Sequence, residues 1–86
     1  MHTVELLDEA IRLAERAGYG VRQEWLGGAA GGGCEFRGRR WIFLDLALGP
    51  AEQLDQVLDA LRRDPSVPAL PMPRPLREML PLRKSA

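Results

Sequence analysis

Residues 34–61 read CEFRGRRWIFLDLALGPAEQLDQVLDAL, and this stretch decides the fold. The short segment Cys34–Phe36 and the apolar segment Arg40–Leu46 flank a turn centred on Gly38, a pattern that predicts a β-hairpin. Pro50 then marks the start of an amphipathic helix, because proline is favoured at the first helical position. The stretch therefore predicts strand, turn, strand and helix in immediate succession.

The preceding residues add a helix and a strand. Apolar residues recur with helical spacing over Thr3–Ala17, which predicts an amphipathic helix, and Gly18 is placed to end it. Alternation over Tyr19–Trp25 predicts a half-exposed strand, and the glycine-rich stretch Gly27–Gly33 reads as a flexible connection to the hairpin. The expected element order is helix, three strands, helix.

This order predicts an α+β protein: a two-layer domain over residues 1–64 with a small, mainly antiparallel sheet. Pro65 ends the second helix near Asp64, and six of the seven prolines lie beyond Asp64. Residues 65–86 are therefore predicted to form a proline-rich tail, with at most one helical turn at Leu76–Leu80. The tail is more apolar than a solvated segment needs to be, so we expect it to pack in cis or on a partner.

The apolar strand predicts an interaction surface. Ile42, Leu44 and Leu46 point to one face of Arg40–Leu46, and Trp41 and Phe43 point to the other. A strand that is apolar on both faces is covered on both sides, and the two helices can cover only one. The cover of the second face is expected to be the tail, a second copy of the chain, or another partner. The predicted interaction residues are Trp41, Phe43, Leu70, Met72, Leu76 and Met79.

The bulk properties point to a small protein that works with a partner. Eighty-six residues with zero net charge make one domain, and its charge attracts neither nucleic acid nor an anionic membrane. A chain of this size buries only about 60% of its unfolded surface, which favours a homodimer or a protein partner. One cysteine, no apolar run of membrane length and no secretory signal predict a cytoplasmic protein.

Candidate chemical groups are few. His2 is the only histidine and Cys34 the only cysteine, so neither a metal site nor a Ser-His-Asp triad is expected, and no cofactor is predicted. Cys34 precedes Glu35, which opposes thiolate formation; a buried hydrophobe is the main interpretation and a thiol-dependent function the alternative. Asp45 is interpreted as an acceptor of loop or helix-terminal amide bonds, with a buried acid of raised pKa as the alternative.

Arg37, Arg39 and Arg40 lie beside Trp41, a pattern found where single-stranded nucleic acid stacks on a protein. The glycines of Gly27–Gly33 could add backbone amides for an anion, although no lysine or helix start follows them. Arginines at a hairpin tip also protect a strand edge. A nucleic-acid or anion-binding module is therefore the alternative prediction.

The run RGRRWIFLDLALGPAEQL, with LAERAGYGVRQEWLGG before it, resembles a group of short uncharacterised bacterial proteins over about residues 4–62. The chain is also remotely similar to the front half of ImmA/IrrE-type metallopeptidase domains. In that family a strand and short turn lead into the helix that carries HExxH. The corresponding helix here, Ala51–Arg63, has neither histidine, so the resemblance implies a scaffold without zinc or proteolysis.

Together these observations predict a non-enzymatic cytoplasmic protein of unknown process that acts through protein–protein interaction or homo-oligomerisation. Its contacts are expected at the Trp41/Phe43 sheet face and the tail.

Overall fold

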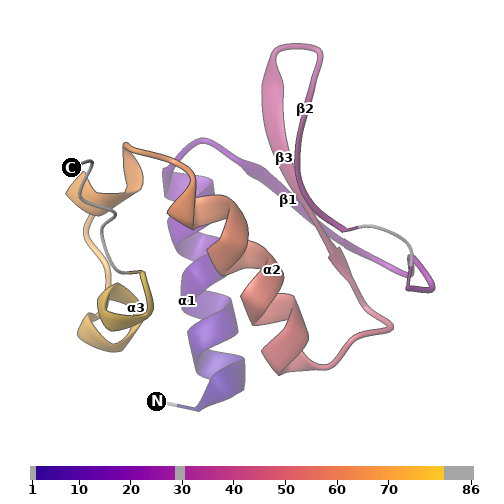
Figure 1. Ribbon diagram of the computed structural model, residues 1–86, viewed down its shortest axis with the longest axis horizontal. Coiled ribbons are helices and arrows are strands. Elements are labelled where there is room, and N and C mark those ends of the chain that lie inside the picture. The colour runs from indigo at the N-terminus through magenta and orange to yellow at the C-terminus, as the bar shows by residue number, and fades with distance from the viewer. Residues whose placement is uncertain (1, 29–30, 81–86) are drawn as a thin grey trace.

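The structure, a computed structural model, describes residues 2–28 and 31–80. Helices α1 and α2 lie side by side on one face of a small sheet, and the C-terminal elements lie on the far side of these helices (Figure 1). The predicted α+β class is confirmed. The elements are α1 (Thr3–Arg16), β1 (Gly20–Glu24), β2 (Gly32–Phe36), β3 (Arg39–Asp45), α2 (Pro50–Arg62), the 3-10 helix η1 (Val67–Ala69) and α3 (Arg74–Met79).

The end of α1 aims the chain into the sheet. Gly18 adopts φ +97°, and its amide donates to the carbonyl of Glu15, while the amide of Tyr19 donates to the carbonyl of Ala14. These two bonds form a Schellman motif. Glycine is favoured at this position because it adopts the left-handed conformation with little strain. The chain turns here so that Tyr19 is buried, and β1 begins at the next residue, Gly20.

The sheet has the strand order β1-β3-β2, so the apolar strand β3 is central. β2 pairs with β3 antiparallel, as the hairpin predicts, but β1 pairs with β3 in parallel, with Gly20 beside Trp41 and Glu24 beside Asp45. The sheet is therefore mixed rather than mainly antiparallel. The physical reason is that β3 alone is apolar on both faces, so it takes the central place and separates the two more polar strands.

The hairpin turn has two residues, Arg37 and Gly38, with φ values of +53° and +76°. Two consecutive positive φ angles define a type I′ turn, whose twist matches that of the flanking strands. Glycine takes this conformation readily, whereas arginine is strained in it. The turn is thus built on one favourable residue and one unfavourable residue.

Replacing Arg37 with asparagine is expected to raise the free energy of unfolding by about 0.5 kcal/mol, because asparagine tolerates a positive φ better than arginine does. Replacing Gly38 with alanine is expected to lower it by about 1 kcal/mol for the converse reason, although a methyl group there would meet open space. Urea denaturation of both variants measures the two changes. Equal effects of the same sign would contradict the type I′ turn.

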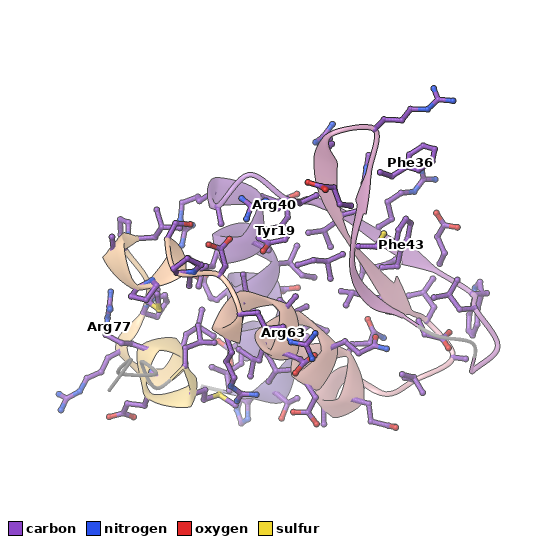
Figure 2. The ribbon with its side chains drawn as sticks, turned by 45° about the horizontal axis from the view of Figure 1, so that its top comes forward. Tyr19, Phe36, Arg40, Phe43, Arg63 and Arg77 are labelled. Atoms are coloured by element: carbon purple, nitrogen blue, oxygen red, sulfur yellow. The ribbon has the colours of Figure 1, made fainter. Side chains whose placement is uncertain are left out.

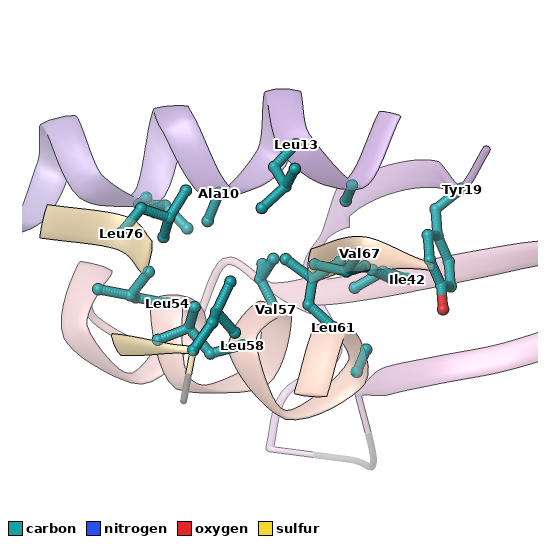
Figure 3. Packing of buried hydrophobic residues seen from close by; sticks show 14 of the residues in the cluster. Ala10, Leu13, Tyr19, Ile42, Leu54, Val57, Leu58, Leu61, Val67 and Leu76 are labelled. Carbon is teal, nitrogen blue, oxygen red and sulfur yellow. The ribbon is translucent and has the colours of Figure 1, made fainter. Parts of the chain in front are cut away.

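The core lies between the sheet and the two long helices. Ile42 and Leu44 of β3 are fully buried, and Ile42 points toward the helices that carry Leu13 and Val57 (Figure 3). Gly33 of β2 lies so close to α2 that a methyl group on it would sit 3.4 Å from the Cβ of Ala60. The inner face of the sheet is thus the face opposite Trp41 and Phe43.

The tail was expected on the second face of the sheet or on a partner, and the structure places residues 65–80 elsewhere. They pack on the side of α1 and α2 that faces away from the sheet (Figure 1). Leu76 of α3 is fully buried near Ala10 and Leu54 (Figure 3), and Val67 is almost fully buried.

Two arginines of the long helices bind the backbone of the tail. Arg16 Nη2 of α1 donates to the carbonyl of Pro71 at 2.9 Å, and Arg62 Nη2 of α2 donates to the carbonyl of Met79 at 2.9 Å. The physical reason for this placement is the width of the apolar stripe on α1, which serves both the sheet and the tail. Residues 81–86 of the predicted tail lie outside the described residues.

Candidate functional site

The face of the sheet that points away from the helices carries aromatic and basic side chains. We call it the outer face. Residues that pair across strands share a face, so the register places on it Gly20, Arg22 and Glu24 of β1, Arg39, Trp41 and Phe43 of β3, and Gly32, Cys34 and Phe36 of β2. Phe36 and Phe43 point away from the helices in Figure 2. Asp45 continues the alternation of Trp41 and Phe43, and the amides of Leu26 and Gly28 bind its carboxylate, so the loop after β1 covers that end of the outer face. Residues 65–80 pack on the helices and leave Trp41 and Phe43 partly exposed.

Trp41 and Phe43 form the centre of the outer face. Their rings stack with centroids 6.2 Å apart and planes 22° apart. The Trp41 ring also covers Gly20, where an added Cβ would come within 2.5 Å of ring carbons. Both aromatic side chains remain partly exposed. Because Gly20 has no side chain, the Trp41 indole can lie flat on the sheet at this position.

Two arginines extend this aromatic cluster. The Arg39 guanidinium carbon lies 4.7 Å from the centroid of the Trp41 ring, and that of Arg37 lies 5.2 Å from the Phe36 ring. These are cation–π contacts, which hold the guanidinium groups close to the outer face. Phe36 is 60% exposed at the end of the cluster.

The third predicted arginine does not join them. Arg40 turns to the inner side of the sheet, where its Nη1 donates to Asp64 Oδ2 at 2.6 Å and its Nη2 to the carbonyl of Ala17 at 2.8 Å. The predicted set Arg37, Arg39 and Arg40 is therefore divided between two faces. Alternation along β3 is the reason, because Arg40 and Ile42 share the buried side.

Arg40 belongs to a partly buried polar network that joins the end of α1, β3 and the end of α2. The Tyr19 hydroxyl donates to Asp64 Oδ2 at 3.0 Å, and the Arg40 guanidinium stacks on the Tyr19 ring at 4.4 Å. Asp64 Oδ1 accepts bonds from the amide and hydroxyl of Ser66. Figure 2 shows Tyr19 and Arg40 close together between the hairpin and the end of α1. Sequence reasoning missed this network, although a carboxylate just before Pro65 was a usable signal.

Asp45 is buried at the end of β3 and binds loop amides. Its carboxylate accepts bonds from the amides of Leu26 (3.0 Å), Gly28 (2.8 Å) and Ala47 (2.9 Å). The bond from Ala47, helped by those from Leu26 and Gly28, lowers the pKa of Asp45 against the opposing effect of burial. The structural interpretation of Asp45 is confirmed, and the interpretation as an acid of raised pKa is wrong.

The same contacts bear on the predicted anion loop Gly27–Gly33. The amides of Leu26 and Gly28 already bind a carboxylate of the chain itself, so this part of the loop does not offer them to an external anion. Residues 29–30 of the loop lie outside the described residues.

Stability is expected to fall at both extremes of pH. Burial raises the pKa of Asp64, but its bonds from Ser66, Tyr19 and Arg40 outweigh this effect, so the pKa is lowered, as it is for Asp45. A lowered folded-state pKa stabilises the protein above the unfolded value of about 4, and this contribution is lost as pH falls through the folded-state values.

The Tyr19 pKa is raised by burial and by its bond to Asp64, so its contribution is present below about pH 10 and lost as pH rises above that value. Thermal melts from pH 2 to 11 should show a plateau of melting temperature between these limits. A melting temperature that is constant from pH 5 down to pH 2 would contradict the bonding of the two carboxylates.

The remaining predicted residues are dispersed. Leu76 is buried inside the molecule, and Leu70, Met72 and Met79 are partly buried against the core, on the opposite side of the helices from Trp41 and Phe43. The six predicted interaction residues therefore do not form one surface. Cys34 was expected to be buried, but it is exposed on the outer face beside Trp41, because β2 lies at the edge of the sheet.

Among residues 2–28 and 31–80, no group of three or more His, Cys, Asp or Glu side chains is arranged to hold a metal ion. No helix in the same residues is long and apolar enough to cross a membrane.

The sequence matches no protein family model, and neither the curated proteins nor the solved structures contain a detectable relative of it. The two resemblances seen in the sequence therefore stay predictions.

Proposed function

We propose that the protein is a non-enzymatic binding protein whose outer face holds a segment of another protein. The observation that carries this proposal is the stacked Trp41–Phe43 pair on a sheet face that residues 65–80 leave uncovered. Phe36 extends the apolar area to the end of the hairpin. Exposed aromatic clusters with arginine at their rim are typical of the energetically important part of protein interfaces.

The charges of the outer face indicate the chemistry of the partner. Arg22 pairs with Glu24 at 2.6 Å, whereas Arg37 and Arg39 make no ion pair with any residue that the structure describes. A segment that combines apolar side chains with Asp or Glu would bury the aromatic rings and pair with these two arginines. The buried carboxylates Asp45 and Asp64 already hold structural bonds, which supports binding rather than acid–base catalysis.

Site-specific photocrosslinking tests this proposal. A photoreactive phenylalanine analogue at position 43, in the centre of the outer face, is compared with one at position 4, because Phe43 is partly exposed on β3 whereas Val4 is exposed on α1. We expect the probe at position 43 to label one protein from the source cells in a segment rich in acidic and apolar residues. A synthetic copy of that segment should bind the purified protein, and Arg39→Glu should weaken binding at least tenfold. Equal labelling from both positions would overturn the proposal.

A second candidate function is binding of single-stranded nucleic acid to the same face. The cation–π pairs Arg39–Trp41 and Arg37–Phe36 favour it, because bases stack on aromatic and guanidinium planes. Fluorescence anisotropy of a labelled oligonucleotide tests it at about 50 and 200 mM salt, where phosphate contacts predict a steep loss of affinity. Absence of binding at the lower salt concentration would end this candidate.

A further inference from the structure

The strand β2 lies at the edge of the sheet with its outward backbone groups free of any strand that the structure describes. The two-residue turn makes Phe36 and Arg39 a hydrogen-bonded pair, so Phe36, Cys34 and Gly32 bond to β3. The amide and carbonyl groups of Gly33 and Glu35 consequently point away from the sheet. Such an edge is a template for another strand.

The sequence of β2 is complementary to itself in one antiparallel register. With a twofold axis at Cys34, all five residues pair: Gly32 lies opposite Phe36 of a second copy, and Gly33 opposite Glu35 of that copy. An axis at Glu35 would instead place two carboxylates directly opposite each other, which is destabilising. An axis at Gly33 would leave Phe36 unpaired.

In the register centred on Cys34, the Phe36 ring also has a surface to pack on. Phe36 lies opposite a glycine of the second copy, and within the chain the Trp41 ring already covers the glycine beside it, Gly20, in the same way. The ring, which is 60% exposed in one chain, would be covered by this pairing.

The charges along this edge permit two copies to approach. Between β2 and α2 lies a groove lined by Glu35 and Asp59 and by Arg40 and Arg63. Two acidic and two basic groups cancel, and the whole chain has zero net charge, so a second copy meets no repulsive field. A partner whose charges are all of one sign would gain no net electrostatic attraction at this edge.

We propose that two copies of the chain join through β2, antiparallel and centred on Cys34, to form one six-stranded sheet. The occupant of the edge is therefore a second copy of this chain. The proposal does not rest on the proposed function, because it uses the edge of the sheet, but it would make the two outer faces continuous. Residue 34 of each copy would form a pair without hydrogen bonds, with Cα atoms about 4.5 Å apart, within the range of a disulfide.

Solution mass with two matched variants tests the dimer. Light scattering of the reduced full-length protein should give twice the chain mass of 9.6 kDa. Glu35→Pro removes the outward amide without touching the bonds to β3, whereas Glu35→Ala removes the same carboxylate and keeps the amide. We expect Glu35→Ala to remain a dimer and Glu35→Pro to be a monomer with an unchanged circular dichroism spectrum. A monomeric native chain at 100 μM, or a folded Glu35→Pro variant that stays dimeric, would overturn the proposal.

Crosslinking tests the register independently of Glu35→Pro. Diamide, which accepts two electrons and two protons from two thiols, should link Cys34 of the two copies nearly completely at low micromolar protein. Moving the only thiol with Cys34→Ser and Phe36→Cys should lower the yield at least tenfold, because residue 36 faces residue 32 of the other copy. Equal yields from positions 34 and 36 would contradict the register. This readout needs no foreign protein, so it fails or succeeds separately from the proposed function.

Discussion

Replacing Leu76 with alanine is expected to lower the free energy of unfolding by about 3 kcal/mol, a typical cost for deleting a fully buried leucine. In a chain of this size, such a loss corresponds to a fall in melting temperature of roughly 12–24 °C. The reason is that Leu76 fills the space between α1 and α2 on the side away from the sheet (Figure 3). Urea denaturation followed by circular dichroism measures the change.

The control for Leu76→Ala is Val4→Ala, since Val4 is 56% exposed on α1 and its truncation should cost less than about 0.5 kcal/mol. Equal, small losses for the two variants would show that α3 does not pack on the long helices. The cis packing of the tail would then be wrong.

Replacing Asp64 with alanine is expected to cost about 3 kcal/mol. The substitution removes the acceptor for Tyr19, Arg40 and Ser66 at once, and buried donors that lose their partner are strongly destabilising. The cost stays moderate because the Arg40 side chain is 43% exposed and can be hydrated. Equilibrium unfolding at pH 7 measures the change.

The matched control is Asp59→Ala, which breaks the exposed ion pair between Asp59 and Arg63 at 3.1 Å. Exposed pairs four residues apart on a helix contribute about 0.3–0.5 kcal/mol, so the two aspartate variants should differ severalfold in their effect. A double-mutant cycle of Asp64→Ala with Arg40→Ala should give a coupling energy above about 1 kcal/mol. Zero coupling would show that the network does not act as a unit.

Much of the local structure could be predicted because it depends on neighbouring residues. The helical spacing in Thr3–Ala17 and the Gly49-Pro50 start of α2 predicted the two long helices, and Gly38 predicted the turn of the hairpin. Alternation in β3 likewise predicted that Trp41 and Phe43 share a face. Each of these signals operates within about four residues of the chain.

The candidate site was predictable only in part. The Trp41/Phe43 face followed from alternation, but the Tyr19–Arg40–Asp64 network joins residues more than twenty positions apart. No local pattern distinguishes an arginine that faces solvent from one that reaches a distant carboxylate. Arg40 was therefore grouped with its sequence neighbours Arg37 and Arg39, although its side chain belongs to the other face.

The sequence by itself determined the two long helices, the three strands and the α+β class, because periodicity and turn residues encode them. Only the tertiary structure decided that β1 pairs in parallel with β3 and that residues 65–80 pack on the helices rather than the outer face. The hydrophobic effect is not directional, so burying an apolar tail is favourable on either the outer face of the sheet or the far side of the helices. Which surface it covers depends on the shape left between α1 and α2, and that shape exists only after the chain has folded.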